Sequence, residues 1–454
     1  MQRYDSIVIG GGPGGYACAL RLAKNNKKTL IIEKSQIGGT CLNRGCIPTK
    51  ALLGSASAVH TLSRGEEFGF TVANTTIDYA AAHTRSRNIV LKLVKGAQKT
   101  LKSRGVDVIY DSASFVAQKV LTTGKHGKFE ANDIVIATGT RPIELPIFAN
   151  LSSTILYPDD ALAMTTVPKS VIIVGAGAIG IEFAYLWGIY GSEVTLVEME
   201  NRILPSFDAD VSALIEKELK KIGVSVYTGT KVEAARKTKE GINITTANES
   251  DSSCFEAETL LLSAGIRPNT YNLGLEQAGV LLNDGNYIKV NSEMLTNVPG
   301  IYAVGDVNGL LTLAHVADAQ GIVAADSICK IKTHTINYLH IPKCVYCNPE
   351  VAMVGKTEEQ CIQSDGNNIE VSKRYFSANG KALGAGESDG FIKMIVNKNS
   401  KELLGAHIVG AHASELITQC TLLMQYEITA EEIDSIVFPH PSLSEIIMDS
   451  LKRF

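Results

Sequence analysis

The 454-residue sequence predicts an α/β protein built around two similar strand–loop–helix units. In the first unit, the apolar run at residues 6–9 ends in a glycine-rich loop at residues 10–15, and an apolar periodic segment then predicts a helix at 16–24. Residues 171–174 lead into a second glycine-rich loop in the same way. In both units another apolar strand follows and ends on a glutamate, and the interval from first glycine to glutamate is the same. The repeat predicts two parallel sheets of one kind.

Both glycine loops have the GxGxxG pattern in its proper setting, between a strand and a helix. The first glycine of such a loop permits a tight turn, the second allows a diphosphate to approach, and the third lets the helix pack on the strand. The terminal glutamate accepts hydrogen bonds from ribose hydroxyls, while the diphosphate lies at the helix N-terminus. The predicted dinucleotide contacts are Gly10, Gly12, Gly15 and Glu33 in the first unit and Gly175, Gly177, Gly180 and Glu198 in the second.

The second unit is expected to prefer NAD to NADP. Glu198 would accept hydrogen bonds from an unmodified ribose and would repel a 2′-phosphate. The next residues include Glu200 and Arg202, so the acidic charges outnumber the single arginine.

Three further apolar strands end at residues that suit a cofactor site. Residues 134–139 and 260–265 each close one unit with an apolar strand and a glycine. Residues 301–304 precede Gly305 and Asp306. An aspartate at the carboxyl end of a strand suits ribityl or phosphate contacts, although alone it is equally well explained as a helix cap.

Cys41 and Cys46 form a cysteine pair just after the first unit's glutamate. The four residues between them rule out thioredoxin spacing. Pro48 suits the first turn of a helix, and a helix N-terminus together with Lys50 is expected to lower a thiol pKa and favour the thiolate. Because the pair follows Glu33 by only eight residues, we predict a redox-active disulfide that faces the first dinucleotide, with Lys50 as a contact to that cofactor.

A base for thiol–disulfide exchange is predicted near the C-terminus. His440 lies between two prolines, and Ser442 or Ser444 has the position of a helix cap. Glu445 on that helix is placed to orient the imidazole. A His-Pro turn is often only structural, so the prediction depends on the cysteine pair, which has no other obvious base.

Composition excludes several classes of protein. A net charge of −4 gives no expectation of nucleic-acid binding. The apolar window at 170–191 contains Glu182 and five glycines, which favours strand–turn–helix over a membrane span. Nine cysteines without framework spacing predict a reducing, cytoplasmic compartment. Cys344 and Cys347 form a CxxC without a second pair nearby, so packing is favoured over a metal site.

These motifs follow one another in the order found in the flavoprotein pyridine nucleotide–disulfide oxidoreductases. The chain resembles this family from Ser6 to its end, and within the family it resembles the dihydrolipoyl dehydrogenases. The resemblance implies two Rossmann-like dinucleotide-binding domains, for FAD and NAD, plus an α+β C-terminal dimerisation domain. The implied boundaries are 1–145 for the FAD-binding domain, 146–270 for the NAD-binding domain, 271–336 for a central domain and 337–454 for the interface domain.

The resemblance also implies roles for individual residues. Cys41 is then the interchange thiol, Cys46 the charge-transfer thiol, and Lys50 approaches the flavin. In the family the histidine that corresponds to His440 reaches the cysteines of the other subunit, which implies a homodimer. The implied cofactor contacts are Ala113, Asp306 and Ala314 for FAD, and Val232, Ala264, Gly265 and Arg267 for NAD. Thr40, Thr138, Gly139 and Glu182 complete the set of predicted cofactor-binding residues.

The implied activity is oxidation of protein-bound dihydrolipoamide, with electrons passing through FAD to NAD⁺. The implied partners are the lipoyl domains and E2 core of a 2-oxo-acid dehydrogenase complex, or the H protein of glycine cleavage. Within the enzyme class, the alternative is a glutathione- or trypanothione-type reductase, which the acidic Glu198 and Glu200 disfavour. From a different class, the alternative is a subunit whose main task is docking onto a multienzyme complex.

Overall fold

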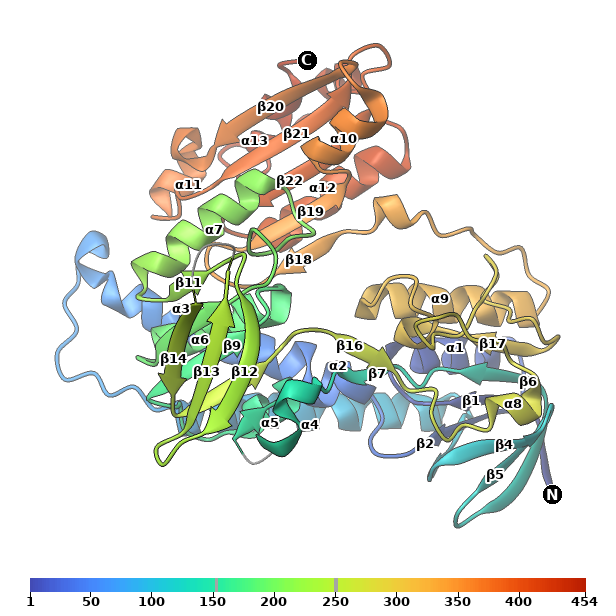
Figure 1. Cartoon of the computed structure of the whole chain (residues 1–454). Helices are drawn as coiled ribbons and strands as arrows, with labels where there is room; N and C mark the ends of the chain where they lie inside the picture. Colours follow the sequence, from blue (N-terminus) through green and yellow to red (C-terminus); the bar gives the residue numbers. More distant parts are fainter. Residues whose placement is uncertain (152–153, 249–251) are drawn as a thin grey trace. The chain divides into compact units, whose positions relative to one another are not determined.

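The computed structural model describes residues 1–151, 154–248 and 252–454 (Figure 1). The chain forms two compact units. The first comprises residues 1–51, 83–143 and 265–336, and the second comprises 52–82, 144–264 and 337–454. The segment 271–336 is grouped with N-terminal residues, and residues 52–82 are grouped with the second unit. The predicted division into four domains stays a prediction.

The first unit is organised around a sheet in which β3, β2, β1 and β6 lie side by side, with β5 and β4 beyond β6 and with β17 also paired to β6. The β1–β2, β2–β3, β1–β6 and β6–β17 pairs are parallel. The strands are β1 Gln2–Ile9, β2 Thr29–Glu33, β3 Asp107–Tyr110, β4 Ala113–Ala117, β5 Val120–Thr123, β6 Gly127–Ile136 and β17 Ile301–Ala303. The antiparallel pair β7 Thr140–Pro142 and β16 Ile266–Pro268 lies outside this sheet.

The parallel strands are buried on both faces. Successive residues of β1 contribute to opposite cores, Ile7 and Ile9 to one and Val8 to the other. The second of these cores includes Cys18 and Leu22 from α1 (Pro13–Lys24) and residues of α9 (Ala314–Ile328). Such strands are expected to be apolar throughout rather than alternating, which is why they stand out in the sequence.

Three helices in succession contain the cysteine pair and the residues that hydrogen-bond to its backbone. They are α2 Gly39–Arg44, α3 Cys46–Ser63 and α4 Tyr79–Ser103. Residues 52–63 of α3 and 79–82 of α4 belong to the second unit. The first unit also contains α8 Leu275–Ala278 and the short 3₁₀ helix η3 Gly305–Asn308.

The second unit contains a parallel sheet with the order β11, β10, β9, β15, β8. Its strands are β8 Ile155–Leu156, β9 Ser170–Val174, β10 Glu193–Val197, β11 Ser225–Tyr227 and β15 Thr259–Leu262. Helices α5 Pro158–Ala163, α6 Ala178–Ile189 and α7 Ala209–Lys221 belong to the same region. An antiparallel sheet is formed by β12 Lys231–Lys237, β13 Ile242–Ala247 and β14 Ser252–Ala257.

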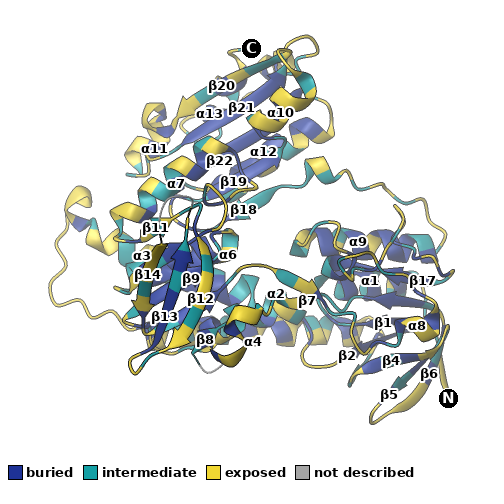
Figure 2. Ribbon diagram, in the orientation of Figure 1, coloured by how far each residue is buried: buried dark blue, intermediate teal, exposed yellow. Residues whose placement is uncertain are grey.

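The C-terminal part of the second unit is an antiparallel sheet with the order β18, β19, β22, β21, β20. Its strands are β18 Lys343–Val345, β19 Val351–Gly355, β20 Ile369–Tyr375, β21 Phe391–Asn397 and β22 Leu403–Val409. The accompanying helices are α10 Glu358–Asp365, α11 Gly380–Gly384, α12 Ala413–Gln425 and α13 Glu445–Leu451. Buried side chains of α12 and α13 share one core with this sheet, and Figure 2 shows the central strands as the buried part.

The strands and helices predicted around the two glycine loops are confirmed. Both loops connect a buried parallel strand to a helix, and the strand order β3–β2–β1–β6 is repeated as β11–β10–β9–β15. The apolar window at 170–191 is β9 followed by α6, as predicted. Among the described residues, no helix combines the length and apolarity needed to cross a membrane.

Candidate dinucleotide and redox sites

The first and third glycines of each loop are required by the packing of the chain itself. Gly10 has a φ of +107°, and a Cβ there would lie 2.3 Å from the carbonyl oxygen of Ala137. A Cβ on Gly15 would lie 2.0 Å from the carbonyl oxygen of Gly10. The second loop repeats this arrangement, because Gly175 has a φ of +100° and a Cβ on Gly180 would lie 2.0 Å from the Gly175 carbonyl oxygen. These contacts hold each helix tightly against its strand.

The middle glycines face open space. The nearest atom to a Cβ on Gly12 would be the Gly39 Cα at 3.9 Å. Among the residues that the structure describes, no heavy atom lies within 4 Å of a Cβ on Gly177. Protein packing therefore does not explain these two glycines. Each lies at the N-cap of its helix, α1 or α6, so the residues fit a diphosphate bound against the helix N-terminus.

Glu33 and Glu198 hold the two loops in the same way. Glu33 accepts hydrogen bonds from the backbone N–H of Gly11 at 2.7 Å and of Ser35 at 2.8 Å. Glu198 accepts from Ala176 N–H at 2.6 Å and from Glu200 N–H at 2.9 Å. Both side chains are buried. The predicted repeat therefore extends to the hydrogen bonds, and each carboxylate lies at the edge of its glycine loop.

Cys41 and Cys46 are brought together at the junction of two helices. Cys41 lies in α2, and Cys46 is the first residue of α3. A hydrogen bond to Cys46 and then burial raise the pKa of the Cys41 thiol, and Lys50 lowers it only in part. The expected lowering is thus wrong for Cys41 in this dithiol form.

Side chains from outside the cysteine segment fix its backbone. Asn43 donates to the carbonyl oxygens of Ile37 at 3.1 Å and Gly39 at 2.9 Å. From α4, Arg87 donates to the Asn43 carbonyl at 2.8 Å and Ser86 to the Pro48 carbonyl at 3.1 Å. These bonds satisfy carbonyls around the cysteine pair and fix the relative positions of α2 and α3.

Asp306 lies close enough to the cysteine pair for its charge to raise the pKa of Cys41. It follows β17 in η3, and the Thr140 hydroxyl donates to its Oδ2 at 3.1 Å. Burial raises the pKa of Asp306, and the Thr140 hydrogen bond opposes that rise. A buried carboxyl group that accepts from one hydroxyl retains capacity for a polar cofactor group.

The other residues predicted to contact the first dinucleotide lie in the same unit. Thr138 and Gly139 follow β6 and are held by Asn269, whose side chain donates to the Thr138 carbonyl at 2.9 Å. Ala314 is the first residue of α9, and Ala113 is buried at the start of β4. Thr40 is exposed in α2.

The residues predicted to contact NAD are divided between the units. The second unit contains the glycine loop, Glu182, Glu198, Val232 and Ala264, and the first unit contains Gly265 and Arg267. Glu182 is buried in α6 and accepts from the Tyr346 N–H at 3.1 Å, so it also supports the fold. Val232 lies in β12 and Arg267 in β16.

His440 and Glu445 form the predicted pair. Glu445 Oε1 lies 2.8 Å from His440 Nδ1, and Glu445 Oε2 accepts from the Ser442 N–H at 2.8 Å. The Ser442 hydrogen bond and then the His440 contact lower the pKa of Glu445. The imidazole is 81% exposed and therefore accessible to a reactant or a partner. Ser444 occupies the cap position of α13, although its side chain makes no capping bond.

Cys344 and Cys347 pack into different cores, which agrees with the predicted packing role. Cys347 belongs to the core of the parallel sheet of the second unit, whereas Cys344 packs against the core around α12. The Cys347 thiol also donates to the Pro349 carbonyl at 3.2 Å.

The comparisons with known proteins cover almost the whole chain. Residues 4–321 match the family model described as pyridine nucleotide-disulphide oxidoreductase, and residues 341–451 match its dimerisation domain. A dihydrolipoyl dehydrogenase of Corynebacterium glutamicum is 40% identical over 99% of this chain and 97% of its own length. A Bacillus subtilis protein of the same name is 37% identical over 98% of this chain and 96% of its own length.

Solved structures match over the same extent. The LpdA protein of Mycobacterium tuberculosis superimposes with a TM-score of 0.91 at 28% identity, covering 100% of this chain and 99% of its own. The HOCl-induced flavoprotein disulfide reductase RclA of Escherichia coli gives 0.89 at 27% identity, covering 100% of both chains. The predicted fold, two dinucleotide-binding domains followed by a C-terminal dimerisation domain, is confirmed.

Proposed function

Because the chain belongs to the pyridine nucleotide-disulphide oxidoreductase family, we propose that it is a dihydrolipoyl dehydrogenase. It is an FAD-dependent, NAD-linked oxidoreductase, as its family and its relatives indicate. The observation that supports the proposed reaction with the substrate is the meeting of Cys41 and Cys46 at the junction of α2 and α3, in the unit that holds the first glycine loop. A dithiol substrate can exchange with such a pair when it is oxidised.

The cysteines perform the exchange with the substrate. A thiolate of dihydrolipoamide attacks Cys41 of the Cys41–Cys46 disulfide, and Cys46 leaves as a thiolate. The second substrate thiol then attacks the mixed disulfide, which releases lipoamide and leaves the enzyme as a dithiol. FAD, bound at the first glycine loop, supplies the chemistry that passes the two electrons on to NAD⁺.

We assign His440 as the base that removes a proton from the substrate thiol. Its Nδ1 contacts Glu445, so the Nε2 atom is left to accept that proton. The imidazole is exposed, and we place it against the cysteine pair of a second subunit. The match of residues 341–451 to the dimerisation domain supports this homodimer.

We further propose that the physiological substrate is a lipoyl group carried on a protein domain, in the cytoplasm. The partners would be the lipoyl domains and E2 core of a 2-oxo-acid dehydrogenase complex or the H protein of glycine cleavage. The names of the relatives support the substrate, and the absence of disulfide-framework spacing among the nine cysteines of the sequence supports the compartment.

Replacing Cys46 with serine tests the proposal. The Cys46→Ser variant should lose dihydrolipoamide-dependent NAD⁺ reduction while it still binds FAD and transfers electrons from NADH to ferricyanide. Cys254→Ser, at an exposed position far along the chain, is the matched control and should keep full activity. Unchanged dihydrolipoamide turnover in Cys46→Ser would exclude the exchange mechanism and favour a docking subunit.

A further inference from the structure

Arg202 is the one basic residue in the segment 198–208, which begins with Glu198, the predicted ribose contact. This segment folds back against the second glycine loop. The Leu204 N–H donates to the Ala176 carbonyl at 2.9 Å, and the Glu198 carbonyl accepts from Thr230 N–H at 2.8 Å. Arg202 therefore lies in the stretch of backbone between Glu198 and Leu204, the residue that contacts the glycine loop. A guanidinium in such a place is suited to pair with a ribose 2′-phosphate.

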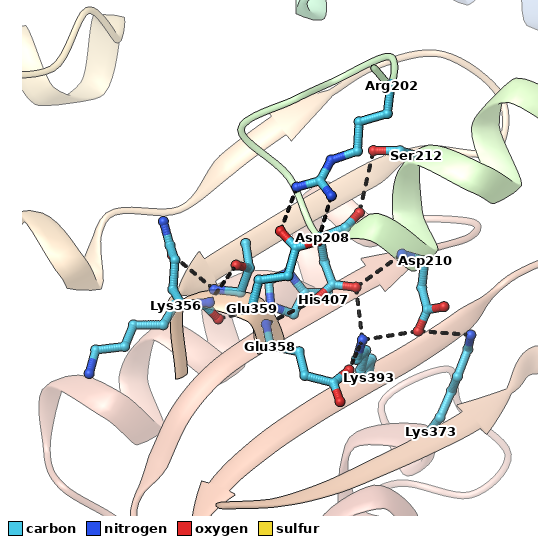
Figure 3. A network of polar contacts seen from close by, with 12 residues as sticks. Arg202, Asp208, Asp210, Ser212, Lys356, Glu358, Glu359, Lys373, Lys393 and His407 are labelled. Atoms are coloured by element: carbon cyan, nitrogen blue, oxygen red, sulfur yellow. Dashed lines mark hydrogen bonds and ion pairs between the residues drawn. The ribbon is translucent and has the colours of Figure 1, made fainter. Parts of the chain in front are cut away.

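The Arg202 guanidinium is already engaged by Glu359. Its Nη1 lies 2.6 Å from Glu359 Oε1 and its Nη2 lies 2.7 Å from Oε2, which is a bidentate pair. The hydrogen bonds to Glu359 raise the pKa of Arg202, and the charge of Asp208 adds to this effect. Figure 3 shows the side chain extending from its loop toward Glu359.

The chain neighbour of Glu359 belongs to an ion cluster around the buried Lys393 side chain. Glu359 is the second residue of α10, and its neighbour Glu358 pairs with Lys393 at 2.5 Å. Lys393 is only 5% exposed and also pairs with Asp208 at 2.8 Å and Asp210 at 3.0 Å (Figure 3). The Glu358 N–H donates to Asp208 at 3.1 Å. The start of α10 is thereby fixed to the start of α7, which follows the Arg202 segment.

We propose that Glu359, outside the nucleotide fold, is a specificity-determining residue that excludes NADP. By neutralising Arg202 in a bidentate pair, it withholds the cation that a 2′-phosphate would need. The negative charges of Glu198 and Glu200 then repel that phosphate, and the Arg202 charge no longer offsets the repulsion. The inference rests on the proposed assignment of the second glycine loop to NAD, and it assigns a role to a side chain from the C-terminal sheet region.

Removal of the Glu359 carboxylate should free Arg202 for a phosphate. We would measure binding of adenosine 2′,5′-bisphosphate and of 5′-AMP to the FAD-loaded enzyme by calorimetry. In Glu359→Gln, affinity for the bisphosphate should rise about threefold to tenfold, because an exposed ion pair of this size competes only modestly. Affinity for 5′-AMP should stay unchanged. Glu359→Ala should behave in the same way and serves as the second variant.

Two controls distinguish the effect of the Arg202–Glu359 ion pair from a general effect of charge. Glu216→Gln breaks the Glu216–Lys220 pair on α7, removes the same charge and should leave bisphosphate binding unchanged. Arg202→Gln added to Glu359→Gln should abolish the gain. A gain in Glu216→Gln, a gain that survives loss of Arg202, or no gain in either Glu359 variant would overturn the inference. Failure of the proposed function would appear instead as absence of dihydrolipoamide oxidation in the unaltered enzyme.

Discussion

At the scale of single residues, the glycine loops contain glycines of two kinds, those required by packing and those that face open space. Gly180 is required by the fold, because a Cβ would meet the Gly175 carbonyl oxygen at 2.0 Å. Gly177 faces space that no described side chain or backbone fills. The two positions are three residues apart in one loop and should respond differently to the same substitution.

We expect Gly177→Ala to weaken NADH binding by about tenfold or more while the free energy of unfolding changes by less than about 1 kcal/mol. Gly180→Ala should instead lower the free energy of unfolding by about 1–3 kcal/mol, because the extra methyl group overpacks the helix–strand contact. Urea unfolding and NADH titration of both variants measure the two quantities. Equal losses of stability at the two positions would contradict the account.

The contact between Glu445 and His440 predicts a selective loss of activity. Glu445→Ala removes the 2.8 Å contact that orients the imidazole. Dihydrolipoamide-dependent turnover should fall by about tenfold to a hundredfold, since a positioned base contributes about that much or more. Electron transfer from NADH to ferricyanide does not need the base and should be retained. Parallel loss of both activities would mean that the residue serves the fold rather than the exchange.

At the scale of elements, His407 on β22 lies near the ion cluster around Lys393. Its ring is fully buried, and its Nε2 lies 3.0 Å from the Lys356 carbonyl oxygen. Burial lowers the pKa of His407, although Asp208, the Lys356 carbonyl and Asp210 oppose that lowering, and Lys393 adds to it. The folded protein therefore holds this histidine neutral at pH values where the unfolded chain is protonated.

This difference predicts a loss of stability on acidification. Below about pH 6.5 the unfolded chain binds a proton that the folded state excludes, so the free energy of unfolding falls by at most about 1.4 kcal/mol per pH unit from this group. His407→Gln should flatten that part of the curve measured by urea unfolding between about pH 5 and pH 7. His126→Gln, at an exposed position, is the matched control. An unchanged slope in His407→Gln would refute this linkage.

The elements predicted from the sequence are those with local signals. The fold around the first cofactor could be predicted from local patterns, because each pattern depends only on neighbouring residues. These patterns are the buried parallel strands, the glycine loops and the Cys41–Cys46 spacing. The sequence also gives some indication that Thr140 and Asn269 lie near the site, because each follows closely after an apolar strand that ends in a glycine. The sequence offers no local sign that Arg87 holds the cysteine segment or that Glu359 engages Arg202. The two residues of the first contact are 44 positions apart in the sequence, and those of the second are 157 positions apart.

At the scale of the whole molecule, the proposed placement of His440 against the cysteines of the partner subunit predicts complementation. A dimer of Cys46→Ser with His440→Gln has one site with both defects and one site with none. Co-expression of the two variants should therefore restore about a quarter of the unaltered activity, because about half of randomly paired dimers are mixed. The rate of dihydrolipoamide oxidation in the mixture, compared with each variant alone, measures the effect. No restoration would place the base in the same subunit as its cysteines.

We propose that this chain oxidises a dithiol at Cys41 and Cys46 and passes the electrons to NAD⁺. The most direct measurement is an anaerobic titration of the FAD-loaded protein with dihydrolipoamide and then NAD⁺, followed by visible absorbance. We predict a long-wavelength band from the Cys46 thiolate against the flavin on addition of the dithiol, followed by formation of NADH on addition of NAD⁺. An unchanged spectrum with dihydrolipoamide, together with turnover of NADPH and glutathione disulfide, would contradict the account.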